Sequence, residues 1–160
     1  LERVTVKGIA EKLGCSVQPI YSYCENMEGL RNDVAERARR FLREYVEARA
    51  DRGDLFRSTG RAYLQAAKEE PHIFRMFIFQ ERKNISSLEE FYRAEANPLM
   101  ARGIADALGI GVSEAARLHL NMLIYTVGIG TVFSVATPGI PAEEGFSQQE
   151  QAYQAFLRAL

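Results

Sequence analysis

Apolar residues recur at intervals of three and four positions along almost the whole chain. No run of alternating apolar and polar residues is bounded by hairpin turns, so the pattern favours helices over strands. We therefore expect an all-α protein. The pattern and its breaks predict helices over Val6–Leu13, from Ser16 as cap to about Cys24, Met27 to about Ala50, Leu55 to about Glu70, Pro71 to about Gln80, Ser87 to about Leu108, Ser113 to about Ala136 and Ser147–Leu160.

Capping residues and breakers place the ends of these helices. Thr5, Ser16 and Asn26 each stand where a helix N-cap is expected, because their side chains can accept a bond from a free backbone N–H. Gly14 is suited to the left-handed turn that ends a helix. A proline at position 98 predicts a bend in the helix around it. Residues Thr137–Gly145 are expected to form a loop.

The chain divides at the polar stretch Asp51–Asp54. The 160 residues are enough for a small module followed by a larger one. We expect a module over residues 1–50 that ends in a long connecting helix, and a helical domain over residues 51–160. The chain opens at Leu1 in the middle of a pattern, so we expect further sequence to precede it.

Composition narrows the candidate chemistry. The formal net charge is −1, which argues against nucleic-acid binding by the surface as a whole but leaves a local contact open. Two cysteines, Cys15 and Cys24, make no disulfide framework and fit a reducing cytoplasm. His72 and His119 lie far from them, and the spacing matches no zinc pattern. The sequence thus predicts a cytoplasmic protein without a metal or another cofactor.

The uncharged run Leu118–Ala142 is long enough to cross a membrane. Two features argue against a membrane span. The run contains polar residues and glycines, and one of its flanks carries acidic rather than basic residues. A helix that is apolar all round is typical of one buried on two sides. We expect one face to pack within the subunit and the other, which includes Gly128, to pack against a second copy.

The two short segments around Gly14 predict a helix-turn-helix, in which the second helix enters the DNA major groove and the first braces it. Ile9, Ala10 and Leu13 form the expected inner stripe of the first helix, and Ile20 supplies the matching contact on the second. Short helix–Gly–helix corners also occur in all-α proteins without any role in DNA binding, and the residues alone leave that alternative open.

The start of the second helix carries the candidate base contacts. Gln18 can offer a donor and an acceptor to adenine, and its apolar neighbours can touch a thymine methyl group. Hydroxyl groups and one lysine are candidates for phosphate contacts, which position the protein without selecting sequence. The predicted DNA-binding residues are Thr5, Lys7, Ser16, Val17, Gln18, Pro19, Tyr21 and Tyr23. The two tyrosines could instead be ordinary aromatic residues at the edge of a core.

The segment Val4–Val34 resembles the DNA-binding region of the tetracycline-repressor (TetR) family. The resemblance rests on Thr5, Ile9, Ala10, Gly14, Cys15, Ser16, Tyr21, Tyr23, Cys24 and Leu30, and Tyr63–Phe77 is also similar to the ligand-domain pattern of many members. It implies a homeodomain-like helix-turn-helix module followed by a helical domain that binds a small effector and dimerises through its last two helices. The family's first helix is absent from this numbering, and Cys24 and Met27 replace its usual Phe and phosphate-contacting Lys.

This resemblance implies a ligand-responsive transcriptional regulator, a repressor, that binds a palindromic operator as a homodimer and is released by a small, mostly apolar effector. Buried polar groups such as those of His119 and Asn121 need partners, and a ligand can supply them. The candidate effector-binding residues are Tyr63, Phe74, Phe77, Phe91, Met100, Met122, Tyr125 and Thr126. The candidate dimer interface is Ile124, Gly128, Thr131, Val135, Tyr153, Phe156 and Leu157.

Two other classes of function remain open from the sequence. An enzyme is disfavoured because no nucleophile–base pair stands out and the motif Gly109-Ile110-Gly111 follows no strand. A helical interaction module or small-molecule-binding protein without DNA binding would share the composition. Oxidant sensing by the two cysteines is a lesser alternative, since a cysteine in a turn is more often a small hydrophobe.

Overall fold

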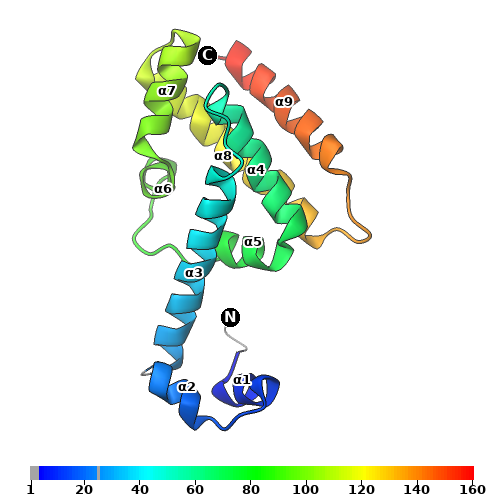
Figure 1. Cartoon of the computed structure of the whole chain (residues 1–160). Coiled ribbons are helices and arrows are strands. Elements are labelled where there is room, and N and C mark those ends of the chain that lie inside the picture. The colour runs from blue at the N-terminus through cyan, green and yellow to red at the C-terminus, as the bar shows by residue number, and fades with distance from the viewer. Residues whose placement is uncertain (1–3, 25) are drawn as a thin grey trace.

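The computed structural model of the chain describes residues 4–24 and 26–160 and, within them, contains nine helices and no strand (Figure 1). The all-α prediction is therefore confirmed for this part of the chain. The helices are α1 Val6–Leu13, α2 Gln18–Tyr23, α3 Met27–Glu47, α4 Leu55–Glu69, α5 Pro71–Ile78, α6 Leu88–Glu95, α7 Pro98–Leu108, α8 Val112–Val135 and α9 Ala142–Arg158.

Helices α1 and α2 form a small unit at the free end of α3, apart from the other six helices (Figure 1). We call α1, α2 and the first turn of α3 the N-terminal unit, and helices α4 to α9 the body. The unit has its own cluster of buried side chains: Val6, Ala10, Ile20 and Cys24. Such a small core buries little apolar area, and the unit gains its attachment to the rest of the chain through α3.

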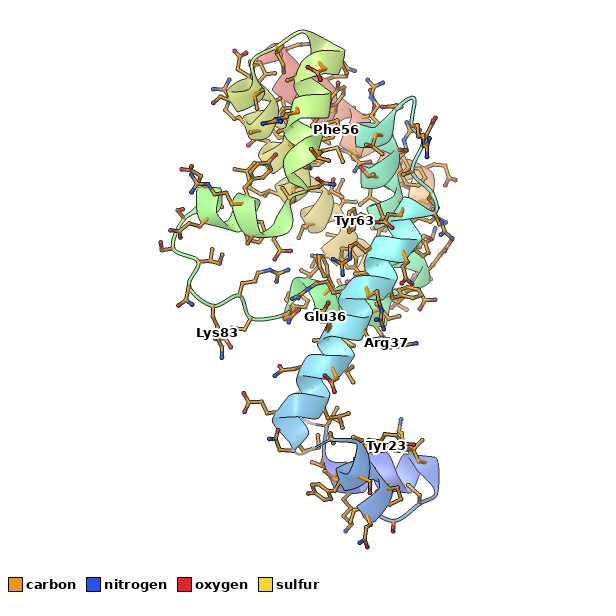
Figure 2. All side chains as sticks on the ribbon, turned by 60° about the vertical axis from the view of Figure 1, so that its left-hand side comes forward. Tyr23, Glu36, Arg37, Phe56, Tyr63 and Lys83 are labelled. Carbon is orange, nitrogen blue, oxygen red and sulfur yellow. The ribbon has the colours of Figure 1, made fainter. Side chains whose placement is uncertain are left out.

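Helix α3 spans the distance between the N-terminal unit and the body (Figure 1). Its second half is docked: Leu42 is 1% exposed and clusters with Tyr45 and Ala66. The Tyr45 hydroxyl donates a hydrogen bond to Glu69 Oε2 on α4 at 2.5 Å, and Arg39 Nη2 donates to Gln80 Oε1 at 2.6 Å. In the middle of α3, the side chains of Glu36 and Arg37 are exposed (Figure 2), whereas the flanking Ala35 and Ala38 are buried.

Helix α8 is the central element of the body and packs against α4, α5, α7 and α9. Ala115 and Leu118 on α8 are fully buried, in one cluster with Ile104 of α7 and Tyr153 of α9. Its C-terminal end is held by Arg75, whose guanidinium donates to the carbonyl oxygen of Ser134. Among the described residues, α8 is also the one helix with the length and composition of a membrane span. The core helix of a soluble protein passes the same test, so this is weak evidence for a membrane.

The predicted caps of the first and third helices are confirmed. Thr5 Oγ1 accepts a bond from the backbone N–H of Gly8 at 3.1 Å, and α1 ends at Gly14 in the left-handed conformation with φ +66°. Asn26 Oδ1 accepts from the N–H of Gly29 at 2.8 Å. These ends depend on local side-chain and backbone chemistry, which the sequence carries by itself.

Three local predictions for the N-terminal unit are wrong. Ser16 is not the cap of α2, which begins at Gln18 after Val17 and has no side-chain cap. A proline in the first turn already has the helical φ, so the helix can begin there without one. Leu13 is 68% exposed rather than inward-facing, because Val6 and Ala10 form the buried side of α1. Cys15, predicted as a buried hydrophobe, is exposed.

The predicted helix Ser87 to Leu108 is two helices, α6 and α7, rather than one bent helix. Ala96 and Asn97 have extended backbone conformations, with ψ of 143° and 121°. The residue before a proline disfavours the α conformation, and here the disruption extends one residue further. The Asn97 side chain then accepts a bond from the N–H of Leu99 at 2.9 Å and starts α7 as a new helix.

The last helix begins at Ala142, five residues before the predicted start at Ser147, and the loop that precedes it is correspondingly shorter. Local propensity favours a loop around Gly145, but tertiary packing decides otherwise. A Cβ atom on Gly145 would overlap the ring of Phe133 on α8. The glycine therefore allows α9 to approach α8 closely, at the usual cost of a glycine within a helix.

Candidate functional site

The N-terminal unit exposes a group of side chains around the turn between α1 and α2. Tyr23 is 91% exposed, Tyr21 55% and Val17 41%, and Gln18 and Pro19 are exposed beside them. Ile20 is buried in the core of the unit, so one side of α2 faces this core and the other side faces solvent. Tyr23 lies far from Phe56 and Tyr63 of the body (Figure 2).

All eight predicted DNA-binding residues lie in this unit and are exposed: Thr5, Lys7, Ser16, Val17, Gln18, Pro19, Tyr21 and Tyr23. Thr5 already accepts the bond that caps α1, which leaves its hydroxyl proton free for a further acceptor. Cys24, which stands where the resemblance would place Phe, is buried, and its thiol donates to the carbonyl oxygen of Ile20. Met27 packs against the same core rather than standing free as a surface contact.

The body contains a cavity of about 570 Å³, which lies within the size range of small-molecule sites. Residues from α3 through α9 line it, so the cavity is at the junction of the body and the connecting helix. Four phenylalanines supply aromatic wall: Phe56, Phe74, Phe77 and Phe91. Phe56 and Tyr63 are on α4, the helix beside α3, in Figure 2.

Seven of the eight predicted effector-binding residues line this one cavity: Tyr63, Phe74, Phe77, Phe91, Met100, Met122 and Thr126. Tyr125 does not. It is turned toward α9, where its ring meets Phe156 edge-on at 6.2 Å between centroids and its hydroxyl donates to Gln148 at 3.4 Å. Thr126 and the following Val127 line the cavity, whereas Tyr125, about 100° away from Thr126 in the opposite sense, faces α9 instead.

A buried polar pair, Thr126 and Gln149, forms part of the cavity lining. Gln149 Nε2 donates to Thr126 Oγ1 at 2.8 Å, which joins α9 to α8. A Cβ on Gly60 of α4 would come within 2.7 Å of the same nitrogen, so the glycine leaves room for the glutamine. The buried polar group of Thr126 that the sequence singled out thus has a partner within the chain.

His119, which the sequence analysis named as a buried polar group that a ligand could partner, also lines the cavity. Its Nδ1 is 2.8 Å from the hydroxyl of Tyr92 on α6, and the rings of Tyr92 and Phe56 meet it edge-on. Burial lowers the pKa of His119 to about 4, so the imidazole is neutral at pH 7. Burial likewise raises the pKa of Tyr92, which stays a phenol.

Two arginines at the cavity are paired with carboxylates that also line it. Arg82 Nε lies 2.8 Å from Glu95 Oε1, and both side chains are less than one-fifth exposed. The Arg82 guanidinium also donates to the carbonyl oxygens at the C-terminal end of α5. Arg57 Nη2 lies 3.1 Å from Glu150 Oε1 on α9. Burial and the negative charge of Glu95 raise the pKa of Tyr63.

Sequence reasoning missed Phe56, Arg82 and Gln149 as cavity residues. Phe56 recurs at helical spacing on the same side of its helix as Tyr63 and Ala67, but periodicity cannot separate a filled core from a cavity wall. Gln149 lies in a stretch rich in polar residues, and only its packing against α8 makes it buried. No local signal would have identified these three residues.

An exposed apolar face follows α8. Ile124 is 45% exposed, Val132 49% and Val135 61%, and Gly128 is exposed between them. Of the predicted interface residues on this helix, Thr131 is half-buried and donates to the carbonyl oxygen of Val127. Val132 was missed, although the spacing of four from Gly128 would have included it.

The candidate interface residues of α9 lie differently. Tyr153 is buried in the chain's own core, with its ring 5.7 Å from that of Phe56 and beneath the Arg57 guanidinium. The structure thus places it away from any exposed face of α9. Phe156 and Leu157 are half-buried against the same cluster and keep part of their surface accessible.

Among the described residues, no group of three or more His, Cys, Asp or Glu side chains is arranged to hold a metal ion. Comparisons of the chain with protein-family models, curated proteins and solved structures found no significant match. Function therefore has to be argued from the residues and the geometry given above.

Proposed function

We propose that the protein is a ligand-responsive DNA-binding transcriptional regulator of the TetR type, a repressor that binds a palindromic operator as a homodimer. In this proposal the N-terminal unit is a helix-turn-helix module, with α2 as the recognition helix, and the body is the effector-binding and dimerisation domain. A small, mostly apolar effector in the cavity releases the DNA. The cytoplasm is the expected location.

One observation carries the proposal. The residues that the sequence singles out as DNA contacts are exposed together on a separate unit at one end of α3, while the other end of α3 lines the cavity (Figure 1). Gln18 and Pro19 begin the exposed turn of α2, where a recognition helix presents its first residues to base edges. This arrangement supports a link between ligand and DNA through a single helix.

Contacts between α3 and the body support the release mechanism. Val46 of α3 lines the cavity and is buried, and Phe77 of α5 both lines the cavity and packs against the α3 cluster. A ligand that fits better when α3 is displaced would change the separation of the two recognition helices in a dimer. It shifts the equilibrium only by the difference in its affinity for the two arrangements.

The exposed face of α8 is the candidate surface for the second copy. A two-fold contact would place Ile124, Gly128, Val132 and Val135 against the same residues of the partner, and the glycine would let the two helices approach closely. A dimer doubles the DNA contacts of a small recognition unit. It selects half-sites about 34–36 Å apart or a multiple of that spacing.

The test is DNA selection with the full-length protein at low salt. We expect a palindrome, and we expect Gln18→Ala to weaken binding to it at least about fivefold and to relax the preference at one base position. Tyr23→Ala should weaken binding to all sequences alike, since a phosphate contact carries no sequence preference. Lys83→Ala, in the loop between α5 and α6 (Figure 2), is the matched control and should bind as the wild type does.

A small-molecule-binding helical protein without DNA binding is the second candidate. It is favoured by Met27, which packs in the core where the family resemblance would place a phosphate-contacting lysine, and by the net charge of −1. Under this alternative no sequence is enriched, and Gln18→Ala and Tyr23→Ala leave ligand binding and self-association unchanged. Enrichment of no DNA, with and without added ligands, would reject the regulator.

A further inference from the structure

The Tyr63 hydroxyl and His119 Nε2 are hydrogen-bonding groups at the cavity that have no partner within the described chain; Arg57 Nε is another. The Tyr63 hydroxyl makes no hydrogen bond with a described residue, although Tyr63 stacks on Phe77 with ring centroids 6.5 Å apart. On His119, Nδ1 is engaged by Tyr92 and Nε2 is not engaged. The Tyr63 hydroxyl and His119 Nε2 are not among the described polar atoms that are both fully buried and without a partner, so both atoms have accessible surface. Both residues line the cavity.

The partner of His119 fixes which proton its ring carries. A neutral imidazole has one N–H donor and one acceptor nitrogen. A ring nitrogen is a better acceptor than a phenol oxygen, so the Tyr92 hydroxyl donates to Nδ1 and the proton resides on Nε2. His119 therefore offers the cavity a single uncharged donor, held in place by Tyr92 on one side and the edge contact with Phe56 on the other.

The charges around the cavity do not suit an ionised ligand. Arg82 is satisfied by Glu95 and by backbone carbonyl oxygens, and Arg57 Nη2 lies against Glu150, although Arg57 Nε has no partner among the described residues. The other charged lining residues are exposed to solvent: Arg43, Glu47 and Arg61. An ionised group placed among the phenylalanines would lose its hydration, and the guanidinium groups of Arg82 and Arg57 are already paired with carboxylates. The low pKa of His119, caused by burial, keeps that residue neutral as well. Much of the remaining wall is aromatic and aliphatic, which favours flat apolar ligands.

We propose that the cavity binds an uncharged, largely aromatic ligand with an oxygen acceptor of the carbonyl type, which accepts a hydrogen bond from His119 Nε2–H. The Tyr63 hydroxyl serves a second polar group of the same ligand. This inference rests on the proposed function in taking the cavity as the effector site, and it names the chemical class of the effector. The cavity volume of about 570 Å³ leaves room for two or three fused or linked rings.

The experiment measures competition for a fluorescent probe, N-phenyl-1-naphthylamine, on the purified protein at pH 7. Three competitors that share a framework of two rings on one carbon are compared: diphenylmethane has no acceptor, benzophenone has a carbonyl group, and 4-benzoylbenzoate adds a negatively charged carboxylate to benzophenone. We expect 4-benzoylbenzoate to compete at least about tenfold more weakly than benzophenone, because its carboxylate must be desolvated and the guanidinium groups of Arg82 and Arg57 are already paired with carboxylates.

Variants test the hydrogen bond itself. For each protein, the affinity for benzophenone is divided by the affinity for diphenylmethane. In His119→Phe this ratio of affinities should fall about fivefold or more, the value expected for one neutral hydrogen bond. Comparing this ratio between wild type and variant cancels the difference in hydrophobicity between the two ligands. His119→Gln keeps an N–H donor in place of the ring and should retain part of the ratio. His72→Phe changes the exposed histidine of α5 and should leave the ratio unchanged.

Three results would overturn the proposal: no binding of the probe, tighter competition by 4-benzoylbenzoate than by benzophenone, or an unchanged ratio in a folded His119→Phe protein. These results are distinguishable from failure of the proposed function. Selection of a palindromic operator by the same protein would show that DNA recognition stands and that only the ligand class was wrongly assigned.

Discussion

At the scale of single residues, burial decides what His119 can do. The ring is held among Phe56, Tyr92 and the cavity, and its pKa falls to about 4 because the imidazolium form would be poorly hydrated there. In the unfolded chain the same group titrates near its ordinary value of about 6.5. The unfolded state therefore binds more protons than the folded state between these two pH values.

The stability of the protein should depend on this difference. As pH falls from about 6.5 to about 4, His119 should reduce the free energy of unfolding by about 3 kcal/mol in total, because protonation favours the unfolded chain. Urea unfolding between pH 4.5 and 7.5 should show a shallower decline in His119→Phe than in the wild type. Tyr92→Phe keeps the buried imidazole and should retain the decline, whereas equal slopes in all three proteins would contradict the assignment.

At the scale of elements, helix α8 is asymmetric around its axis although its sequence is apolar on every side. Gly130 faces the core, where a Cβ atom would overlap the ring of Phe74, which is 1% exposed. Gly128, two residues earlier, has no atom within 4 Å of where its Cβ would be. The same residue type therefore has opposite consequences on the two sides of one helix.

Two alanine substitutions should show this difference. Gly130→Ala should lower the free energy of unfolding by about 1–3 kcal/mol, since the buried Phe74 ring has to move. Gly128→Ala should raise it by about 0.5–1 kcal/mol at protein concentrations where the chain is monomeric, because alanine favours the helix and nothing obstructs it. Chemical denaturation of both variants checks the signs, and a similar loss in both would mean that the two faces are equally packed.

The end of α6 shows where the sequence pattern was ambiguous at this scale. Periodicity continues across Ala96 and Asn97, so the residues predict one helix with a bend. The break consists of two adjacent extended residues and a new cap at Asn97, and periodicity alone does not separate it from a bend. By contrast, the start of α3 at Asn26 follows from one local hydrogen bond and was predicted correctly.

At the scale of the whole molecule, α3 connects two parts that bury separate cores. The cluster of the N-terminal unit includes Ala10 and Ile20, and a separate cluster of the body includes Leu118. In the proposed regulator the geometry of a dimer would determine which DNA half-site spacing fits, so the exposed face of α8 and the exposed residues of α2 have to act together.

Removing self-association should therefore remove operator binding. Ile124→Glu places a charge in the exposed apolar face of α8 at little cost to the monomer, because Ile124 is already 45% exposed. We expect sedimentation velocity to show a monomer and the affinity for a palindrome to drop to that of a half-site. Leu99→Glu alters a 70% exposed leucine on α7 and should leave both unchanged. Dimers that persist in Ile124→Glu would place the interface elsewhere.

The sequence by itself determined the helical class and most helix ends, because periodicity, caps and breakers act over a few residues. It identified Tyr63, Phe74, Phe77, Phe91, Met100, Met122 and Thr126, which share one cavity. Only the tertiary structure decided that Tyr125 turns away, that Tyr153 is core, and that Gln149 is buried beside Thr126. Each of these depends on which helix packs against which face, and that choice is made by contacts between residues far apart in the chain, which local periodicity does not encode.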